Sequence, residues 1–145
     1  MKITIFILAS SICLCGNADA NNSQNAIDLS GKWCNQLGSH MELSINGSNV
    51  DGKFYTAVGN ADGSYVLRGR RLVNDDGSQN LGFVVAWENQ LYKNSHSVTA
   101  WAGQAQIIDG KPTITTQWLL VRQTPSEKNW ESTWVNKDIF TRCNK

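Results

Sequence analysis

Short stretches in which apolar and polar side chains alternate recur along the chain from Gly31 to Arg142. Alternation with a period of two places the apolar side chains on one face of a β-strand. Asn-Gly or Asp-Gly pairs, which favour tight turns, occur at 46–47, 51–52, 62–63 and 109–110. No segment keeps a helical period over about a dozen residues. The pattern predicts an all-β chain of eight strands, over residues 31–39, 41–45, 53–58, 64–71, 81–88, 97–106, 112–122 and 130–142.

Consecutive short strands joined by tight turns favour an antiparallel up-and-down barrel or a sandwich. A sandwich would have a solid core, whereas a barrel of eight strands is about wide enough to hold one small ligand. The alternation pattern alone does not separate these two architectures.

The segment Gly82–Trp101 predicts a hairpin with an unusual inner face. Its period of two puts Trp87 and Trp101 on the same side as Ser97 and Thr99. A packed core seldom carries hydroxyl groups, whereas a small-molecule site combines apolar walls with a few placed polar groups. We therefore expect this hairpin to form part of a ligand site.

The chain has 145 residues, which suits one domain. Its 13 basic and 12 acidic residues are scattered singly and give a net charge of +1. Without a basic stripe or an acidic tail, nucleic acids and membrane surfaces are disfavoured as partners.

Residues 1–20 have the pattern of a secretory signal peptide. Lys2 precedes a short apolar run, and Ala18–Ala20 forms a cleavage site of small residues. The run is too short to span a bilayer. We expect cleavage at about Ala20 and a secreted or periplasmic protein, with a flexible N-terminus over 21–29 and the folded domain over 30–145.

Several short sequence motifs occur in a fixed order along the predicted strands. They are GKW at 31–33, NQLGS at 35–39, AVGNA at 57–61, YVL at 65–67, VAW at 85–87, HS at 96–97, TQWLL at 116–120, and Asp138 followed by FT at 140–141. This ordered set resembles the avidin and streptavidin family of biotin-binding proteins, and its residues are closer to those of the bacterial streptavidin-like branch. The resemblance covers nearly the whole mature chain. It implies an eight-stranded avidin-like barrel, a homotetramer, and biotin bound in the mouth of the barrel.

By this resemblance, Asn35 and Ser39 donate hydrogen bonds to the ureido oxygen of biotin. Asp138 and Thr56 accept from its two N–H groups. Thr99 contacts the thioether sulfur. Without the family context, Asn35 and Ser39 could be a polar pair beside a turn, and Asp138 an exposed residue at a strand end.

The remaining implied contacts hold the carboxylate of biotin and enclose the ligand. Ser97 and the backbone N–H of Asn60 hold the carboxylate, although Ser97 could be an ordinary loop residue. The apolar enclosure consists of Trp87, Trp101, Trp118, Leu37, Val58 and Leu120. Trp130 matches the family tryptophan that caps the site of a neighbouring subunit, while Trp134 is expected in an interface or the core.

Phe54 stands where the family has a tyrosine that donates a third hydrogen bond to the ureido oxygen. Tyr55 is adjacent, but the strand alternation points it out of the barrel. We therefore expect biotin binding to persist and to be weaker than with a tyrosine at position 54.

Cys34 and Cys143 remain after signal cleavage, and exported proteins usually pair their cysteines. The resemblance places Asn35 near Asp138, which would set Cys143 opposite about position 30. A gap of four residues is about 13 Å, too far for a disulfide. We expect no bridge within one subunit, whereas a bridge between subunits stays open.

The sequence assembles no arrangement of catalytic residues, so we expect a binding protein and not an enzyme. His40 and His96 are isolated, which argues against a metal site, and no cofactor is expected apart from biotin as the bound ligand. An avidin-like barrel that carries a different small ligand is the alternative, and Phe54 favours it. A purely structural oligomerisation module would not need the polar ring that the sequence supplies.

Overall fold

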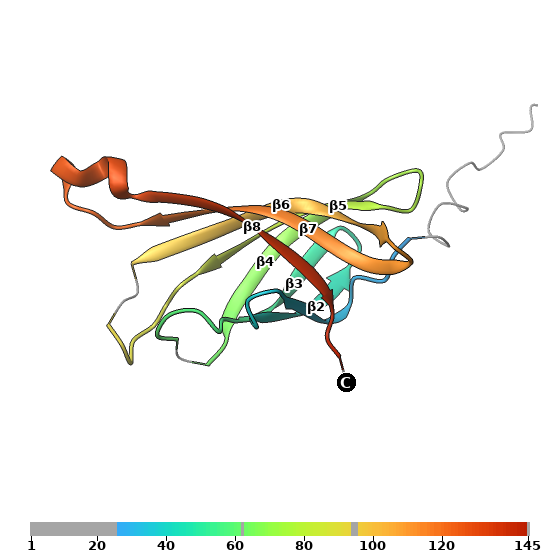
Figure 1. Ribbon diagram of the computed structural model, residues 1–145, viewed down its shortest axis with the longest axis horizontal. Helices are drawn as coiled ribbons and strands as arrows, with labels where there is room; N and C mark the ends of the chain where they lie inside the picture. Colours follow the sequence, from blue (N-terminus) through green and yellow to red (C-terminus); the bar gives the residue numbers. More distant parts are fainter. Residues whose placement is uncertain (1–25, 62, 94–95, 145) are drawn as a thin grey trace, which may run out of the picture.

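A computed structural model describes residues 26–61, 63–93 and 96–144. It is a closed barrel in which each strand pairs antiparallel with the next and the last pairs with the first (Figure 1). The predicted all-β class and the antiparallel eight-stranded up-and-down barrel are confirmed, and the sandwich is excluded. The strands are β1 (Gly31–Asn35), β2 (His40–Asn46), β3 (Asn49–Tyr55), β4 (Tyr65–Val73), β5 (Gln79–Ala86), β6 (Ser97–Ile108), β7 (Lys111–Arg122) and β8 (Thr133–Arg142).

Two strands end earlier than the alternation predicts. β1 stops at Asn35 because the Asn35 side-chain oxygen accepts from the N–H groups of Leu37 and Ser39 and so turns the chain. β3 stops at Tyr55, and the Thr56 hydroxyl bonds both backbone groups of Val58. Local side-chain bonds thus replace the sheet ladder at both places.

β7 and β8 form a long hairpin that extends beyond the rest of the barrel (Figure 1). At its tip lies the short 3₁₀ helix η1 (Ser126–Glu131). The predicted last strand was therefore wrong at its start, because Trp130 belongs to η1 and the strand begins at Thr133.

The barrel core fills the end opposite this hairpin tip. Trp33 is fully buried there, and its indole N–H donates to the Leu29 carbonyl at 2.8 Å. Leu29 is itself fully buried, and the Gln79 amide donates to the Ile27 carbonyl. Residues 26–29 therefore pack against the barrel end, unlike the flexible segment expected over 21–29. Residues 21–25 and the predicted signal peptide over 1–20 lie outside the described residues.

The barrel closes along a short seam between β1 and β8. Only three residue pairs make up this ladder: Trp33 with Arg142, Cys34 with Thr141, and Asn35 with Phe140. The Arg142 guanidinium extends the seam by lying 3.9 Å over the Trp33 ring and by donating to the Ser30 carbonyl. Side-chain contacts thus reinforce a seam that has few ladder bonds.

A disulfide joins Cys34 to Cys143 within the chain, with their Cα atoms 5.1 Å apart. The expectation of no such bridge was wrong for two reasons. Asn35 pairs with Phe140 and not with Asp138, which moves Cys143 two residues closer. β8 also ends at Arg142, so Cys143 leaves the ladder and can approach Cys34.

Two glycines allow neighbouring strands to approach closely. A Cβ atom at Gly69 would lie 2.1 Å from the Gly82 carbonyl oxygen, and one at Gly103 would lie 2.1 Å from that of Thr115. Glycines at such points are typical of strongly coiled sheets, where the backbones come into contact. Among the described residues, no helix is long and apolar enough to cross a membrane.

Candidate functional site

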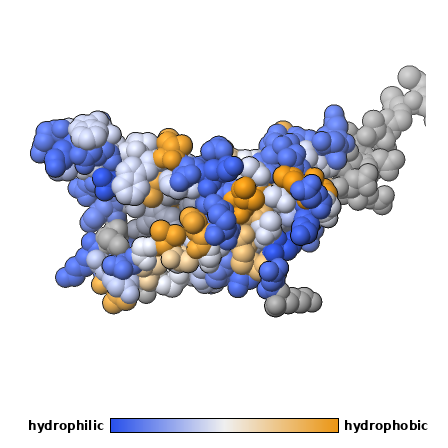
Figure 2. Space-filling model, viewed as in Figure 1, coloured by the Kyte–Doolittle hydropathy of each residue, from blue (hydrophilic) through white to orange (hydrophobic). Residues whose placement is uncertain are grey.

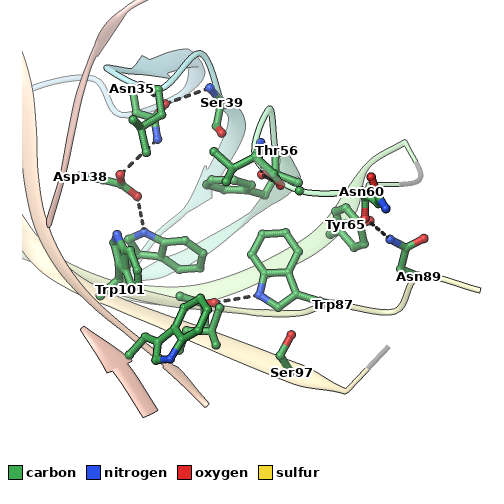
Figure 3. A pocket seen from close by; sticks show the side chains of 18 residues that line it. Asn35, Ser39, Thr56, Asn60, Tyr65, Trp87, Asn89, Ser97, Trp101 and Asp138 are labelled. Atoms are coloured by element: carbon green, nitrogen blue, oxygen red, sulfur yellow. Dashed lines mark hydrogen bonds between the residues drawn. The ribbon is translucent and has the colours of Figure 1, made fainter. Parts of the chain in front are cut away.

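A cavity of about 300 Å³ opens at the end of the barrel from which the β7–β8 hairpin projects (Figure 3). Every residue that the sequence predicts for the site lines this cavity except Trp130. The predicted residues that it brings together are Asn35, Leu37, Ser39, Phe54, Thr56, Val58, Asn60, Trp87, Ser97, Thr99, Trp101, Trp118, Leu120 and Asp138.

Aromatic rings form the inner end of the cavity. Phe54 is buried and stacks on Trp101 with ring centroids 5.1 Å apart. Trp87 contacts Phe54 edge-on at 5.8 Å and Tyr65 at 5.0 Å. Because these rings support one another from three strands and the start of a loop, the apolar wall is rigid before any ligand enters.

Asn35 is held with its amide nitrogen toward the cavity. Its oxygen accepts from the backbone N–H groups of Leu37, at 3.0 Å, and Ser39, at 2.9 Å. Its nitrogen donates to Asp138 Oδ1 at 3.2 Å. The oxygen side is occupied by two donors, so the second amide hydrogen can be offered to a ligand.

Asp138 is buried, and each of its carboxylate oxygens accepts a hydrogen bond from the site. Oδ2 accepts from the Trp101 indole N–H at 2.9 Å, and Oδ1 accepts from Asn35. The Gln36 amide reaches Oδ1 at 3.5 Å and also bonds the backbone on both sides of Asp138, donating to the Lys137 carbonyl and accepting from the Ile139 N–H. A buried carboxylate needs such partners, and its remaining lone pairs can accept from a ligand.

Three hydroxyls of the site, those of Ser39, Thr56 and Thr99, are also oriented by their neighbours. Ser39 Oγ accepts from the Ala57 N–H at 2.9 Å, and Thr99 Oγ1 accepts from the Trp87 indole N–H at 2.8 Å. Each therefore has its proton to donate. Thr56 Oγ1 donates to the Val58 carbonyl at 3.0 Å, so toward the cavity it can act as an acceptor.

These bonds give the inner site a defined polarity. Asn35 and Ser39 offer hydrogens, whereas Asp138 and Thr56 offer lone pairs. A matching ligand carries an acceptor toward the first pair and donors toward the second, because buried polar groups must be paired.

The outer part of the cavity is formed by Ser97, Asn60, Leu37 and Val58. The two apolar side chains are 55% and 58% exposed, so they contribute a rim and not a closed wall. Asn60 lies on the loop after β3, and its carbonyl accepts from the Asn89 amide at 2.5 Å.

Sequence reasoning missed Tyr65, Asn89 and Trp134, which also line the cavity. Tyr65 was detectable, because it pairs with Phe54 across β3 and β4 and so shares its inward face. Trp134 lies at the cavity rim, where the Arg122 guanidinium sits 4.7 Å over its ring. It is 53% exposed, so the expected place in the core was wrong, whereas the expected place in an interface stays a prediction. No sequence pattern marks Asn89, which lies in a loop.

Two other aromatic residues lie outside the cavity. Tyr55 stacks on His40 with ring centroids 4.4 Å apart, which confirms that it points outward. Partial burial, followed by the charge of Lys32, lowers the pKa of His40. Trp130 lies on η1 and is 79% exposed, so it makes no contribution to the cavity of its own chain.

Within the described part of the chain, no group of three His, Cys, Asp or Glu side chains is arranged to hold a metal ion.

Comparison with known proteins agrees with this architecture. The model of the Avidin family matches residues 23–143. Avidin of Gallus gallus is 34% identical over 131 residues, covering 83% of this chain and 81% of the relative. Avidin-related proteins 4/5 and 2 of the same organism are 32% and 29% identical over 127 and 126 residues, with the same coverage. The closer likeness to the bacterial branch stays a prediction. From the family match and the shared identity, the chain belongs to the avidin family.

Proposed function

We propose that this protein binds biotin without chemical conversion. The observation that carries the proposal is the fixed polarity of the inner cavity, where two donors and two acceptors lie beside an aromatic wall. A cyclic urea has the complementary arrangement, because its carbonyl oxygen accepts and its two N–H groups donate. Membership of the avidin family supports the same ligand.

In the proposed complex, Asn35 and Ser39 donate to the ureido oxygen, and Asp138 and Thr56 each accept from one ureido N–H. Thr99 donates to the thioether sulfur, since its oxygen already accepts from Trp87. The side chains of Trp87, Trp101, Trp118, Leu37, Val58 and Leu120 enclose the rings and the aliphatic tail.

The carboxylate of biotin is held at the outer end of the cavity by the Ser97 hydroxyl and the Asn60 backbone N–H. Both groups lie on the cavity lining. A charged acceptor forms stronger hydrogen bonds than a neutral one, so these contacts anchor the tail.

An avidin-like carrier of a different small ligand is the second candidate, and Phe54 is the observation that favours it. The ring is buried and has no donor for the ureido oxygen, so one family contact is lost. The four remaining polar groups, on Asn35, Ser39, Asp138 and Thr56, still match a cyclic urea, which is why biotin is preferred.

We also propose that the protein is a homotetramer. Apolar side chains form a continuous row across the outer face of four strands, from Val84 through Ala100 and Leu119 to Val135. Figure 2 shows hydrophobic side chains exposed on one face of the molecule between more polar ends. Exposed apolar surface of this kind marks protein interfaces. In the tetramer, Trp130 of one subunit would cap the cavity of its neighbour.

Export is part of the proposal, with cleavage of the signal peptide at about Ala20. The Cys34–Cys143 disulfide supports it, because disulfides persist mainly in oxidising compartments.

Titration of the purified mature protein with biotin, followed by intrinsic tryptophan fluorescence, tests the function. We expect a saturable change with one biotin per chain, because Trp87, Trp101 and Trp118 all line the cavity. A chain that folds and shows no saturable response or calorimetric heat with biotin would favour the second candidate.

A further inference from the structure

We propose that Asn89 is a positioning residue for the charged end of the ligand, and that it makes the site selective for a free carboxylate. This inference rests on the proposed function. Asn89 does not touch the carboxylate in this proposal. It acts by fixing the backbone of Asn60 relative to Ser97.

The Asn89 side chain is 3% exposed although it lies in the loop that follows β5. Its amide nitrogen donates to the Asn60 carbonyl at 2.5 Å, and both residues line the cavity (Figure 3). Burying an amide is costly unless it is hydrogen-bonded. The contact therefore links two loops at a well-defined point.

The loop that carries Asn89 is itself anchored to the start of β6. The Trp87 N–H donates to the Ser97 carbonyl at 3.0 Å, which continues the β5–β6 ladder past Ala86. Asn89 follows two residues later. Asn60 thus lies in the loop after β3 and Ser97 at the start of β6, and the loop that carries Asn89 contacts both.

Local bonds turn the chain at the base of the loop that carries Asn60. Thr56 Oγ1 bonds the N–H and the carbonyl of Val58, and Gly59 follows with φ of +77°. Glycine adopts this conformation readily, so the chain beyond Val58 can take several directions. By holding the Asn60 carbonyl, Asn89 limits the direction of the N–H on the same residue.

A carboxylate gains most from two donors that are held at a fixed separation, because charge-assisted bonds are strong and depend on geometry. A neutral amide at the same place forms weaker hydrogen bonds to these donors, so its binding depends less on their fixed separation. Loss of the Asn89 amide should therefore affect biotin more than a derivative whose carboxyl group is an amide.

The test compares dissociation rates of biotin and biotinamide from the wild-type tetramer and from Asn89→Ala and Asn89→Leu. The leucine keeps most of the buried volume, so the two variants separate the lost bond from lost packing. We expect biotin to leave about 3- to 10-fold faster from both variants, in line with one hydrogen bond. We expect the biotinamide rate to change by less than about 2-fold. Gln90→Ala, an exposed neighbour in the same loop, should leave both rates unchanged.

Equal acceleration for the two ligands would show a general loosening of the site and overturn the inference. An unchanged biotin rate in both variants would also overturn it. If the wild-type protein binds neither biotin nor biotinamide, the proposed function itself fails. If the wild type binds both ligands but the Asn89 variants release them at equally increased rates, only the role of Asn89 fails.

Discussion

Single side chains in the cavity have their hydrogen-bonding direction set by neighbours. Ser39 and Thr99 each accept from an N–H group, and Thr56 donates to a carbonyl. Such orientation is present before a ligand enters, so little ordering remains to be done on binding. The affinity of the site therefore depends on these contacts as well as on the groups that face the ligand.

Phe54→Tyr should tighten biotin binding. The added hydroxyl would supply a third donor to the ureido oxygen, worth about 0.5–1.5 kcal/mol, or about 2- to 12-fold in affinity. Biotin dissociation rates measure the effect. Tyr55→Phe is the matched control, since Tyr55 stacks on His40 outside the cavity. An equal or faster dissociation rate in Phe54→Tyr would contradict this prediction.

Gln36→Ala should weaken binding from outside the cavity. The Gln36 amide bonds the Lys137 carbonyl and the Ile139 N–H and so holds Asp138 between them. We expect dissociation about 2- to 12-fold faster, the equivalent of one hydrogen bond. Because Asp138 faces the ureido ring, biotin and biotinamide should be affected equally, unlike in the Asn89 variants. Lys32→Ala, an exposed change on β1 just before Gln36, is the control, and a loss confined to biotin would argue against this role.

At the scale of elements, the alternation of side chains was sufficient to predict eight strands and the inward face of the Trp87–Trp101 hairpin. It could not predict where β1 and β3 end, because the Asn35 and Thr56 side chains stop the ladder through local bonds. The family resemblance, which placed Asn35 near Asp138, misplaced β8 against β1 by two residues. Register along a seam of three pairs depends on the closure of the whole barrel, which alternation does not encode.

The disulfide should stabilise this short seam. Cys34 and Cys143 are separated by 109 residues, and the chain-entropy model gives about 4–5 kcal/mol for a loop of this size. Denaturant unfolding of a Cys34→Ser/Cys143→Ser double variant should show a lower free energy of unfolding than the oxidised wild type. Reductant should lower the stability of the wild type and leave the variant unchanged. Equal stabilities of oxidised wild type and variant would mean that the bridge does not constrain the unfolded chain.

At the scale of the whole molecule, the outer row of apolar side chains and the exposed Trp130 support the proposed tetramer. An indole that is 79% exposed on a short helix has little to pack against in its own chain. A neighbouring subunit would supply the missing contact and close the cavity.

Trp130→Ala should leave the barrel folded and speed the release of biotin. One buried aromatic side chain contributes about 1.5–3 kcal/mol, which corresponds to about 10- to 150-fold. Light scattering should be recorded with the dissociation rate, so that loss of the tetramer is seen separately. Lys128→Ala on the same helix is the control. An intact tetramer with an unchanged rate would exclude capping by Trp130.

The Asn35–Asp138 hydrogen bond joins residues that are 103 positions apart, from the first strand and the last. During synthesis, a chain that ends before β8 therefore lacks both barrel closure and Asp138, one of the two acceptors of the proposed ureido site. Ligand capture would therefore require synthesis to have passed β8, because a chain that ends earlier lacks Asp138. A bound ligand would in turn contact both ends of the chain, so ligand binding would stabilise the folded state against unfolding.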